Sequence, residues 1–276
     1  MKTVCLLGPN LPPFFMDTHP ESEAIEKYAI DLWNAGFGVI APHLNAPRAD
    51  GLIIDEQLKL NFESRVIHDF ADAIFVMPGW ENDETLWVRA AIASEAKKPI
   101  FESIAQIFRW KDNKPFAYLE PRFSSIEKDF RETALKIQPV KIAFVIGKYF
   151  VGERKNNLLI PDRNAIHDNI LVANRIAVML WREGIAAFTP HNNTHHFELK
   201  TRVGEPEYQA FDQLLLERLV DGNVVADNWV NSTGGKKEVA KAQAIGKPII
   251  NSYDIQSIRN WRDGNGNINL ITTVTI

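Results

Sequence analysis

The chain has 276 residues, of which 31 are basic and 35 acidic, and 45% are apolar. It has no apolar run long enough to cross a bilayer, and its interspersed charges give no positive field for a polynucleotide, so we expect neither a membrane span nor a nucleic acid polymer as partner. A single cysteine excludes an intrachain disulfide, and the apolar stretch near the N-terminus is too short for a signal peptide. These features favour a cytoplasmic protein of one large or two ordinary domains.

Two halves of the sequence repeat each other in the same order. The paired segments are 2–8 with 141–147, 32–36 with 180–184, 42–43 with 190–191, 98–100 with 247–249 and 110–112 with 261–263. The offset rises from 139 to 151 residues along the chain, which is what two diverged copies separated by small insertions would give. The sequence therefore predicts two tandem domains, 1–137 and 138–276, with a linking helix over 124–136.

Each half alternates strands with helices. In the first half we expect strands ending at Gly8 and Pro42 and strands over 73–77 and 99–101, with helices over 21–35 and 58–70 and after Trp80. In the second half we expect strands ending at Gly147 and Pro190 and strands over 223–226 and 248–250, with helices over 169–183 and 207–219 and after Trp229. Turn clusters at 112–114 and 263–266 indicate a hairpin-like addition that closes each half. Strands that alternate with helices pair in parallel under helices on both faces, so each half is predicted to be a small doubly wound, Rossmann-like or flavodoxin-like α/β domain.

A polar motif follows the third predicted strand of the second half. Ser232, Thr233 and two glycines lead into a helix that carries Glu238 in or near its first turn. Either hydroxyl would cap the helix, and the glycines let backbone N–H groups approach a ligand. The motif lies beyond the carboxyl end of a parallel strand, where open α/β sheets bind ligands. Because the helix dipole favours an ionised carboxylate there, Glu238 suits a nucleophile rather than an acid.

The spacing Ser-x-Gly-x-x-x-Glu after an apolar strand resembles the nucleoside 2-deoxyribosyltransferase superfamily, which includes the 2'-deoxynucleoside 5'-monophosphate N-hydrolases. The matching residues are, in chain order, Gly147, Tyr149, Pro190, Asn228, Trp229, Ser232, Gly234 and Glu238. The resemblance covers most of residues 141–250. It implies that Glu238 attacks the anomeric carbon of a deoxyribose, and that Ser232 with the adjacent backbone holds a 5'-phosphate or 5'-hydroxyl.

Cleavage of an N-glycosidic bond calls for a second carboxyl group facing the first. The transition state is oxocarbenium-like, so one carboxylate stabilises its charge or bonds to the sugar while an acid assists the leaving base. The family usually places this aspartate eight residues before the aspartate that precedes the third strand. Counting back from Asp221 gives Gln213, and the neighbouring carboxylate is Asp212. Either the helix end carries one extra residue or the role is vacant.

The second half also gains a polar segment, 148–163, after its first strand. It carries Arg154, Lys155 and Arg163, which as part of a lid at the ligand edge would meet the phosphate of a nucleotide. The alternative is a solvated insertion.

Three histidines, His191, His195 and His196, lie near Glu198 and suggest a metal site. Pro190 and the polar residues 192–194 argue against the helix that would align His191 with His195, so neither a metal nor a cofactor is expected.

Each candidate residue also has a structural interpretation. Glu238 could be a solvated carboxylate that serves only the helix dipole. The other structural roles are an N-cap for Ser232, an ordinary surface position for Asp212, packing on the sheet edge for Tyr149, and filling of the space between helix and sheet for Trp229.

The first half departs from the motif. A gapless alignment from Trp80 places Arg89 where the second half has Glu238, and Leu86 where it has a glycine. An arginine cannot act as a carboxylate nucleophile, and a leucine blocks close approach of the backbone. We therefore expect the first half to be a catalytically inactive partner in a pseudo-dimer within the chain. Assembly into homo-oligomers is left open.

The sequence thus predicts an enzyme that cleaves or transfers the N-glycosidic bond of a 2'-deoxynucleotide or 2'-deoxynucleoside through its second half. Two alternatives stay open: pure hydrolysis, as in a 2'-deoxynucleoside 5'-monophosphate N-hydrolase, and a non-catalytic nucleotide-binding or sensor protein. The sequence does not fix the base, the acceptor or the choice between nucleoside and 5'-monophosphate.

Overall fold

The computed structural model describes residues 1–8, 20–45, 55–115, 137–155, 158–194, 197 and 200–271. The chain divides into two compact units. The first comprises Met1–Pro139 with His196–Phe211, and the second comprises Val140–His195 with Asp212–Ile276. The boundary at 139 lies close to the predicted one, but the segment 196–211 groups with the first unit. The predicted linking helix, 124–136, lies outside the described residues.

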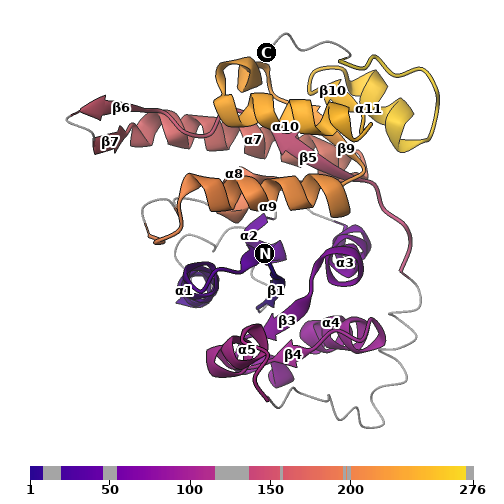
Figure 1. Cartoon of the computed structure of the whole chain (residues 1–276). Helices are drawn as coiled ribbons and strands as arrows, with labels where there is room; N and C mark the ends of the chain where they lie inside the picture. Colours follow the sequence, from indigo (N-terminus) through magenta and orange to yellow (C-terminus); the bar gives the residue numbers. More distant parts are fainter. Residues whose placement is uncertain are drawn as a thin grey trace. The chain divides into compact units, whose positions relative to one another are not determined.

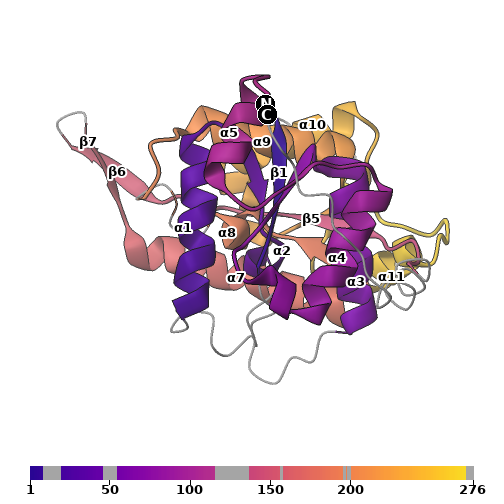
Figure 2. The ribbon, with the colours of Figure 1, turned by 90° about the horizontal axis from the view of Figure 1, so that it is seen from below.

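The first unit is built on a parallel four-stranded sheet of order β2-β1-β3-β4. Its strands are β1 (Thr3–Leu7), β2 (Gly38–Ile40), β3 (Ala73–Val76) and β4 (Ile100–Phe101). Its helices are α1 (Pro20–Asn34), α2 (Pro42–Asn45), α3 (Glu56–Arg65) with the π-helical turn η2 (Val66–Phe70), the 3-10 turn η3 (Trp80–Asn82), α4 (Glu84–Glu95) and α5 (Ile104–Lys111). Figures 1 and 2 show α1 and α5 on one face of the sheet and α3 and α4 on the other. Every strand residue is therefore buried, as in other doubly wound sheets.

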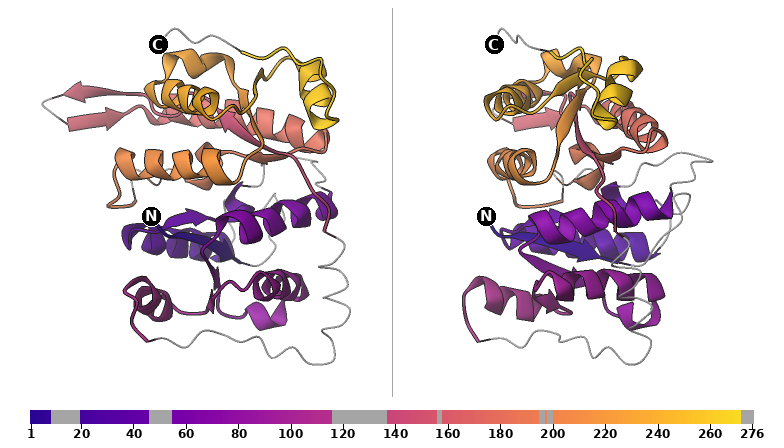
Figure 3. Two further views of the ribbon diagram at one scale, coloured as in Figure 1. Left: turned by 45° about the vertical axis from the view of Figure 1, so that its right-hand side comes forward. Right: turned by 90° about the vertical axis from the view of Figure 1, so that its right-hand side faces the viewer.

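The second unit has a parallel sheet of order β10-β9-β5-β8, which is the strand order of the first unit. Its strands are β5 (Ile142–Ile146), β8 (Ala186–Phe188), β9 (Gly222–Val225) and β10 (Ile249–Asn251). Its helices are α7 (Arg163–Arg182), α8 (Pro190–Asn193), α9 (Glu205–Arg218), the 3-10 turn η5 (Asp227–Asn231), α10 (Thr233–Ala244) and α11 (Ile255–Arg262), and α9 begins within the first unit. Figure 3 shows α7 and α11 over one face and α9 and α10 over the other. The predicted α/β class with two doubly wound parallel sheets is confirmed.

Repeated residues make the same local contacts in the two units. Asp72 accepts a hydrogen bond from the backbone N–H of Thr3 at 2.7 Å, and Asp221 accepts one from that of Ile142 at 2.7 Å. In both units the side chain thus joins the start of the third strand to the start of the first. The repeated aspartates have a structural role at the amino edge of the sheet.

The polar segment 148–163 is not the loop that the sequence predicts. It forms an antiparallel hairpin, β6 (Gly152–Lys155) with β7 (Leu158–Pro161), which projects beyond the N-terminal end of α7 in Figure 1. The helix α7 then begins at Arg163, six residues before the predicted start, because the Asp162 side chain caps it by accepting from the N–H of Ala165. A helix cap and a strand pairing therefore replace the expected loop.

The predicted hairpin-like additions are wrong for the described residues. The clusters at 112–114 and 263–266 instead end the helices α5 and α11, and no strand follows them up to residues 115 and 271. Asn113 and Gly264 take left-handed backbone angles, with φ of 54° and 73°, as residues that follow a helix end commonly do. The turn residues in both clusters do reverse the chain, but they end a helix rather than joining two strands.

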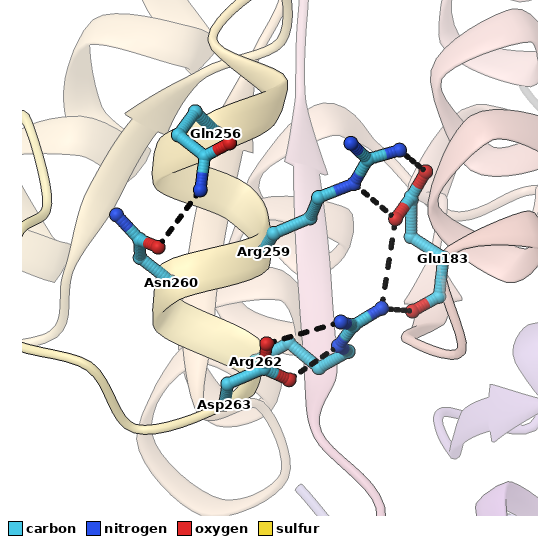
Figure 4. Close-up of polar contacts among 6 residues, drawn as sticks. All are labelled: Glu183, Gln256, Arg259, Asn260, Arg262 and Asp263. Atoms are coloured by element: carbon cyan, nitrogen blue, oxygen red, sulfur yellow. Dashed lines mark hydrogen bonds and ion pairs between the residues drawn. The ribbon is translucent and has the colours of Figure 1, made fainter.

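An ion-pair cluster ties α11 to the C-terminal end of α7 (Figure 4). The guanidinium of Arg259 donates to both carboxylate oxygens of Glu183 at 2.8 Å, and that of Arg262 donates to the Glu183 carbonyl oxygen at 2.9 Å. The hydrogen bonds from Arg259, with the positive charges of Arg259 and Arg262, hold the pKa of the Glu183 carboxyl group below its usual value. The two helices that cover this face are thus fixed to each other at one end.

Among the helices described, none combines the length and the apolar character needed to span a membrane.

Candidate functional site

The second unit brings together two carboxyl groups, Asp212 on α9 and Glu238 on α10. Both helices cover the same face of the sheet (Figure 3), and each side chain is half-buried. Loss of solvation raises the pKa of Glu238 to about 7. Loss of solvation and, secondly, the negative charge of Glu238 raise the pKa of Asp212. Asp212 and Glu238 therefore act on each other electrostatically, and both carboxyl groups are driven toward the protonated form.

The expectation that the helix dipole keeps Glu238 ionised is wrong. Ser232 is the N-cap of α10, so Glu238 is the sixth helical residue and lies in the second turn. The dipole acts mainly within the first turn, whereas protein atoms displace water from the carboxylate at this depth. Desolvation therefore decides the direction of the pKa shift.

Ser232 caps α10, since its Oγ accepts a hydrogen bond from the N–H of Gly235 at 3.0 Å. The two glycines of the motif differ in their surroundings. A Cβ on Gly235 would lie 3.1 Å from the carbonyl oxygen of Trp229, whereas a Cβ on Gly234 would meet nothing nearer than the Ser232 Oγ at 3.8 Å. Gly235 is needed for packing, and Gly234 borders open space where a ligand can approach the backbone.

Asn228 links three segments at the carboxyl edge of the sheet. Its Oδ1 accepts from the N–H of Lys148 at 3.1 Å, and its Nδ2 donates to the Oδ1 of Asn169 at 3.0 Å. Asn169 on α7 donates in turn to the carbonyl oxygen of Tyr149 at 3.1 Å. The Asn228 side chain therefore connects the segment after β5 to α7. Trp229, the next residue, is buried, with 7% of its surface exposed.

His191, for which the sequence suggests only the role of a metal ligand, lies at the same edge. Its Nε2 is 3.2 Å from the carbonyl oxygen of Lys148, and its ring meets the ring of Tyr149 edge-on with centroids 5.2 Å apart. A Cβ on Gly147 would lie 3.8 Å from the His191 Cε1. Burial lowers the pKa of His191 to about 4, so the ring is neutral at pH 7 and donates through Nε2.

The Nδ1 atom of His191 is then a buried acceptor with no partner among the described residues. Such an acceptor suits a hydroxyl or N–H group of a ligand. Within the described ranges no group of three or more His, Cys, Asp or Glu side chains is placed to hold a metal. His195, His196 and Glu198 lie outside those ranges.

Within the described part of the chain, no hydrogen bond or ion pair links the predicted phosphate-binding cations to Asp212 or Glu238. Arg154 and Lys155 lie on β6, and their side chains are not described. Arg163 is the exposed first residue of α7 and forms no hydrogen bond or ion pair with a described residue.

A cavity of about 450 Å³ opens at the carboxyl ends of β9 and β10. Its lining comes from α7 and from the segments after these two strands: Val172, Arg175, Ile176, Met179, Ala226, Asp227, Asn228, Ser252 and Tyr253. The volume lies in the range of small-molecule sites, and the place is the expected one for a doubly wound sheet. Arg175 gave no sequence signal because it is one exposed cation on a long amphipathic helix.

The first unit has an ion pair where the second has two carboxyl groups. The Arg89 Nη2 lies 2.5 Å from the Glu63 Oε2, and both side chains are buried, with 8% and 4% exposure. Glu63 and Arg89 precede Asp212 and Glu238 by the same 149 positions. This correspondence supports Asp212 over Gln213 as the site residue. The ion pair leaves no free carboxylate at this position of the first unit.

Comparison of the chain with protein-family models, curated proteins and solved structures found no match.

Proposed function

We propose that the second unit cleaves or transfers the N-glycosidic bond of a 2'-deoxynucleoside or 2'-deoxynucleotide, in the manner of the nucleoside 2-deoxyribosyltransferases. The interacting pair Asp212 and Glu238 carries this proposal. Two carboxyl groups that share a poorly solvated site do not ionise together easily, so one holds a proton while the other is charged. Glycosidic cleavage uses one carboxylate and one carboxylic acid in this way.

The motif assigns the role of nucleophile to Glu238 and that of acid to Asp212. Burial raises the pKa of both carboxyl groups, and the charge of Glu238 raises the pKa of Asp212 further, so Asp212 is the group that carries the proton in the proposed reaction. The Glu238 carboxylate attacks the anomeric carbon, the bond from that carbon to the base nitrogen breaks, and Asp212 gives its proton to the departing base. An acceptor base or water then attacks the same carbon and releases Glu238, with Asp212 taking back a proton. The open backbone at Gly234 and the Ser232 hydroxyl are suited to hold the 5' group.

We also propose that the two units arose by tandem duplication and that the first has lost its chemistry. The shared strand order, the repeated aspartates at the amino edge and the common 149-residue offset support this. The substrate is a small molecule of the cytoplasm, and no cofactor enters the reaction.

Base release decides the proposal. The full chain is incubated with a panel of deoxynucleosides and their 5'-monophosphates, with and without a second base, and products are separated by liquid chromatography. Glu238→Ala should lower kcat by at least two orders of magnitude, because a nucleophile is needed in every cycle. Asp168→Ala, at an exposed carboxylate on α7, is the control and should leave the rate unchanged.

Exchange of bases indicates transfer, and release without exchange indicates hydrolysis. Tight binding of one nucleotide, without release of a base from any substrate of the panel, would indicate a nucleotide-binding sensor rather than an enzyme. A Glu238→Ala protein that keeps more than about a tenth of the native activity would refute the role of Glu238 as the nucleophile.

A further inference from the structure

The cavity of about 450 Å³ in the second unit lies on the side of the sheet away from α10. One wall is an apolar stripe of α7 that includes Ile176 and Met179, and the other is the connection between β10 and α11. The helices α7 and α11 cover one face of the sheet, whereas α10, which carries Glu238, covers the other (Figure 3). Neither Glu238 nor Asp212 is among the residues that line the cavity. The cavity is therefore separate from the proposed catalytic pair.

Contacts outside the cavity hold its walls. The guanidinium of Arg259 on α11 binds the carboxylate of Glu183 at the C-terminal end of α7, so the two helices are joined at this end (Figure 4). Asp254, the N-cap of α11, accepts from the backbone N–H of Ser257 at 3.0 Å and from its hydroxyl at 2.9 Å. The connection before α11 is thus anchored, and the cavity is formed before any ligand binds, as in most small-molecule sites.

The corresponding place in the first unit is built differently. At the 148-residue offset of α1 and α7, Ile176 corresponds to Tyr28, whose ring packs on that of Phe75 on β3 with centroids 5.2 Å apart. The connection before α11 is also two residues longer than the one before α5, because the offset rises from 149 at the start of β10 to 151 at the start of α11. The second unit therefore has a smaller side chain and a longer connection where its cavity opens.

Two side chains of opposite charge line this cavity. Arg175 on α7 and Asp227 at the start of η5 are both exposed, and neither side chain forms a hydrogen bond or ion pair within the described residues. Tyr253, which also lines the cavity, has 70% of its surface exposed, although aromatic side chains are mostly covered in folded proteins. A cation, a carboxylate and an uncovered ring beside an apolar wall are the groups that hold a flat ligand with polar edges.

The carboxylate of Asp227 restricts the kind of ring that fits. An ionised carboxylate only accepts hydrogen bonds, so it favours a ring edge with two adjacent N–H donors. The amino-oxo-pyrimidine ring that guanine and the pterins share has such an edge, with a ring N–H beside an amino group. Adenine and cytosine instead place a bare ring nitrogen beside the amino group, and this acceptor would face the carboxylate. The guanidinium of Arg175 complements an anionic group on the same ligand.

We propose that this cavity binds a bicyclic ligand with an amino-oxo-pyrimidine edge and an anionic group, as in a guanine nucleotide or a pterin with an acidic tail. Asp227 accepts from the ring N–H and the amino group, Arg175 binds the anionic group, and Tyr253 stacks on the ring. The apolar stripe of α7 covers the opposite face of the ring. The site goes beyond the proposed function, because binding there needs neither Glu238 nor turnover.

Isothermal titration calorimetry of the full chain measures this binding. The probes are GMP, guanosine, AMP, xanthosine 5'-monophosphate and folate, so that no 2'-deoxy substrate of the proposed reaction is present. We expect GMP, folate or both to bind about tenfold or more tightly than AMP, because the carboxylate repels the bare ring nitrogen of adenine. Binding of GMP alone identifies a nucleotide site, and binding of folate alone identifies a pterin site; either result supports the proposal.

Three substitutions separate the contacts. Asp227→Asn presents one acceptor and one donor in place of two acceptors, so it should weaken the ligand of the native chain about tenfold or more. The same variant should gain affinity for xanthosine 5'-monophosphate, whose ring edge has an N–H beside a carbonyl. Arg175→Gln should weaken GMP or folate by about tenfold and leave the affinity for guanosine, which has no anionic group, unchanged. Tyr253→Ala should weaken every ligand by about tenfold.

The matched controls are Asp168→Asn and Arg182→Gln, at exposed positions of α7 outside the cavity lining, and they should leave every affinity unchanged. The inference would be overturned if no probe binds at millimolar concentration, or if AMP binds as tightly as GMP and folate. It would also be overturned if Asp227→Asn and Arg175→Gln both bind the ligand as tightly as the native chain does, since the ligand then binds elsewhere. Absence of base release refutes the proposed function alone, and unchanged affinity in the cavity variants refutes this inference alone.

Discussion

Replacing Glu238 by glutamine should make the protein more stable at neutral pH while removing the proposed glycosidic-bond cleavage. The folded chain raises the pKa of this carboxyl group from its ordinary 4.5 to about 7 because burial penalises the charged form. Glutamine has nearly the same volume and no charge, so it keeps the packing of α10 and removes the penalty. Removing the charge also lowers the pKa of Asp212, which adds a gain of the same sign.

The pH dependence follows from the direction of the shift. Below pH 4.5 Glu238 is protonated in both the folded and the unfolded chain, so no penalty exists. Between pH 4.5 and about 7 the unfolded chain ionises first, and the folded state loses stability relative to it. At about 1.4 kcal/mol per pKa unit, the full loss above pH 7 is about 3 kcal/mol. Glu238→Gln should therefore match the native chain at pH 4 and exceed it by about 3 kcal/mol at pH 8.

Thermal unfolding followed by circular dichroism from pH 4 to pH 8 measures this difference. The expected gain in Tm at pH 8 is about 6 °C or more, at roughly 2–4 °C per kcal/mol for a chain of this size. Glu95→Gln, an exposed carboxylate on α4, is the control and should change Tm by less than about 2 °C at every pH. The desolvation of the Glu238 carboxylate would be refuted if Glu238→Gln were no more stable than the native chain at pH 8, or if its gain in Tm were as large at pH 4.

Three further predictions follow from the same geometry. Gly234→Ala should raise KM and leave Tm unchanged, because this position borders open space. Gly235→Ala should lower Tm, because its methyl group would lie 3.1 Å from a backbone oxygen. The reverse result would contradict the roles given to the two glycines. If Arg163 meets the substrate phosphate, kcat/KM should be about 10- to 100-fold higher for a 5'-monophosphate than for its nucleoside, and Arg163→Ala should abolish that preference. Equal kcat/KM values for the two substrates in the native chain would rule out this role of Arg163. Arg89→Ala leaves the Glu63 carboxylate buried and unpaired, so chemical denaturation should show a loss of about 3–5 kcal/mol, and a loss below about 1 kcal/mol would contradict the buried pair.

Local features of the sequence were sufficient for the element order and for the motif. The apolar runs before Gly147 and in 223–226, and the helical periodicity between them, predict parallel strands under helices, because the alternation itself forces crossover connections. Ser232 and the glycines indicate the start of α10, since capping depends on residues within one turn. The sequence also placed Glu238 on the helix that follows the third strand of the second sheet, where the structure has it.

Contacts between segments distant in the sequence decided the rest. Whether Asp212 or Gln213 turns toward α10 depends on the rotation of α9, which is set by what the helix packs against. The pKa of Glu238 depends on how many protein atoms surround it, and that density has no local sequence signal. The neutral ring of His191 likewise follows from its burial beside Lys148. The sequence by itself determined the strands of the two parallel sheets and the helices between them, because these follow from short-range periodicity and caps. Only the tertiary structure decided which side chains meet and how burial shifts their pKa values, because desolvation is produced by packing across the whole unit.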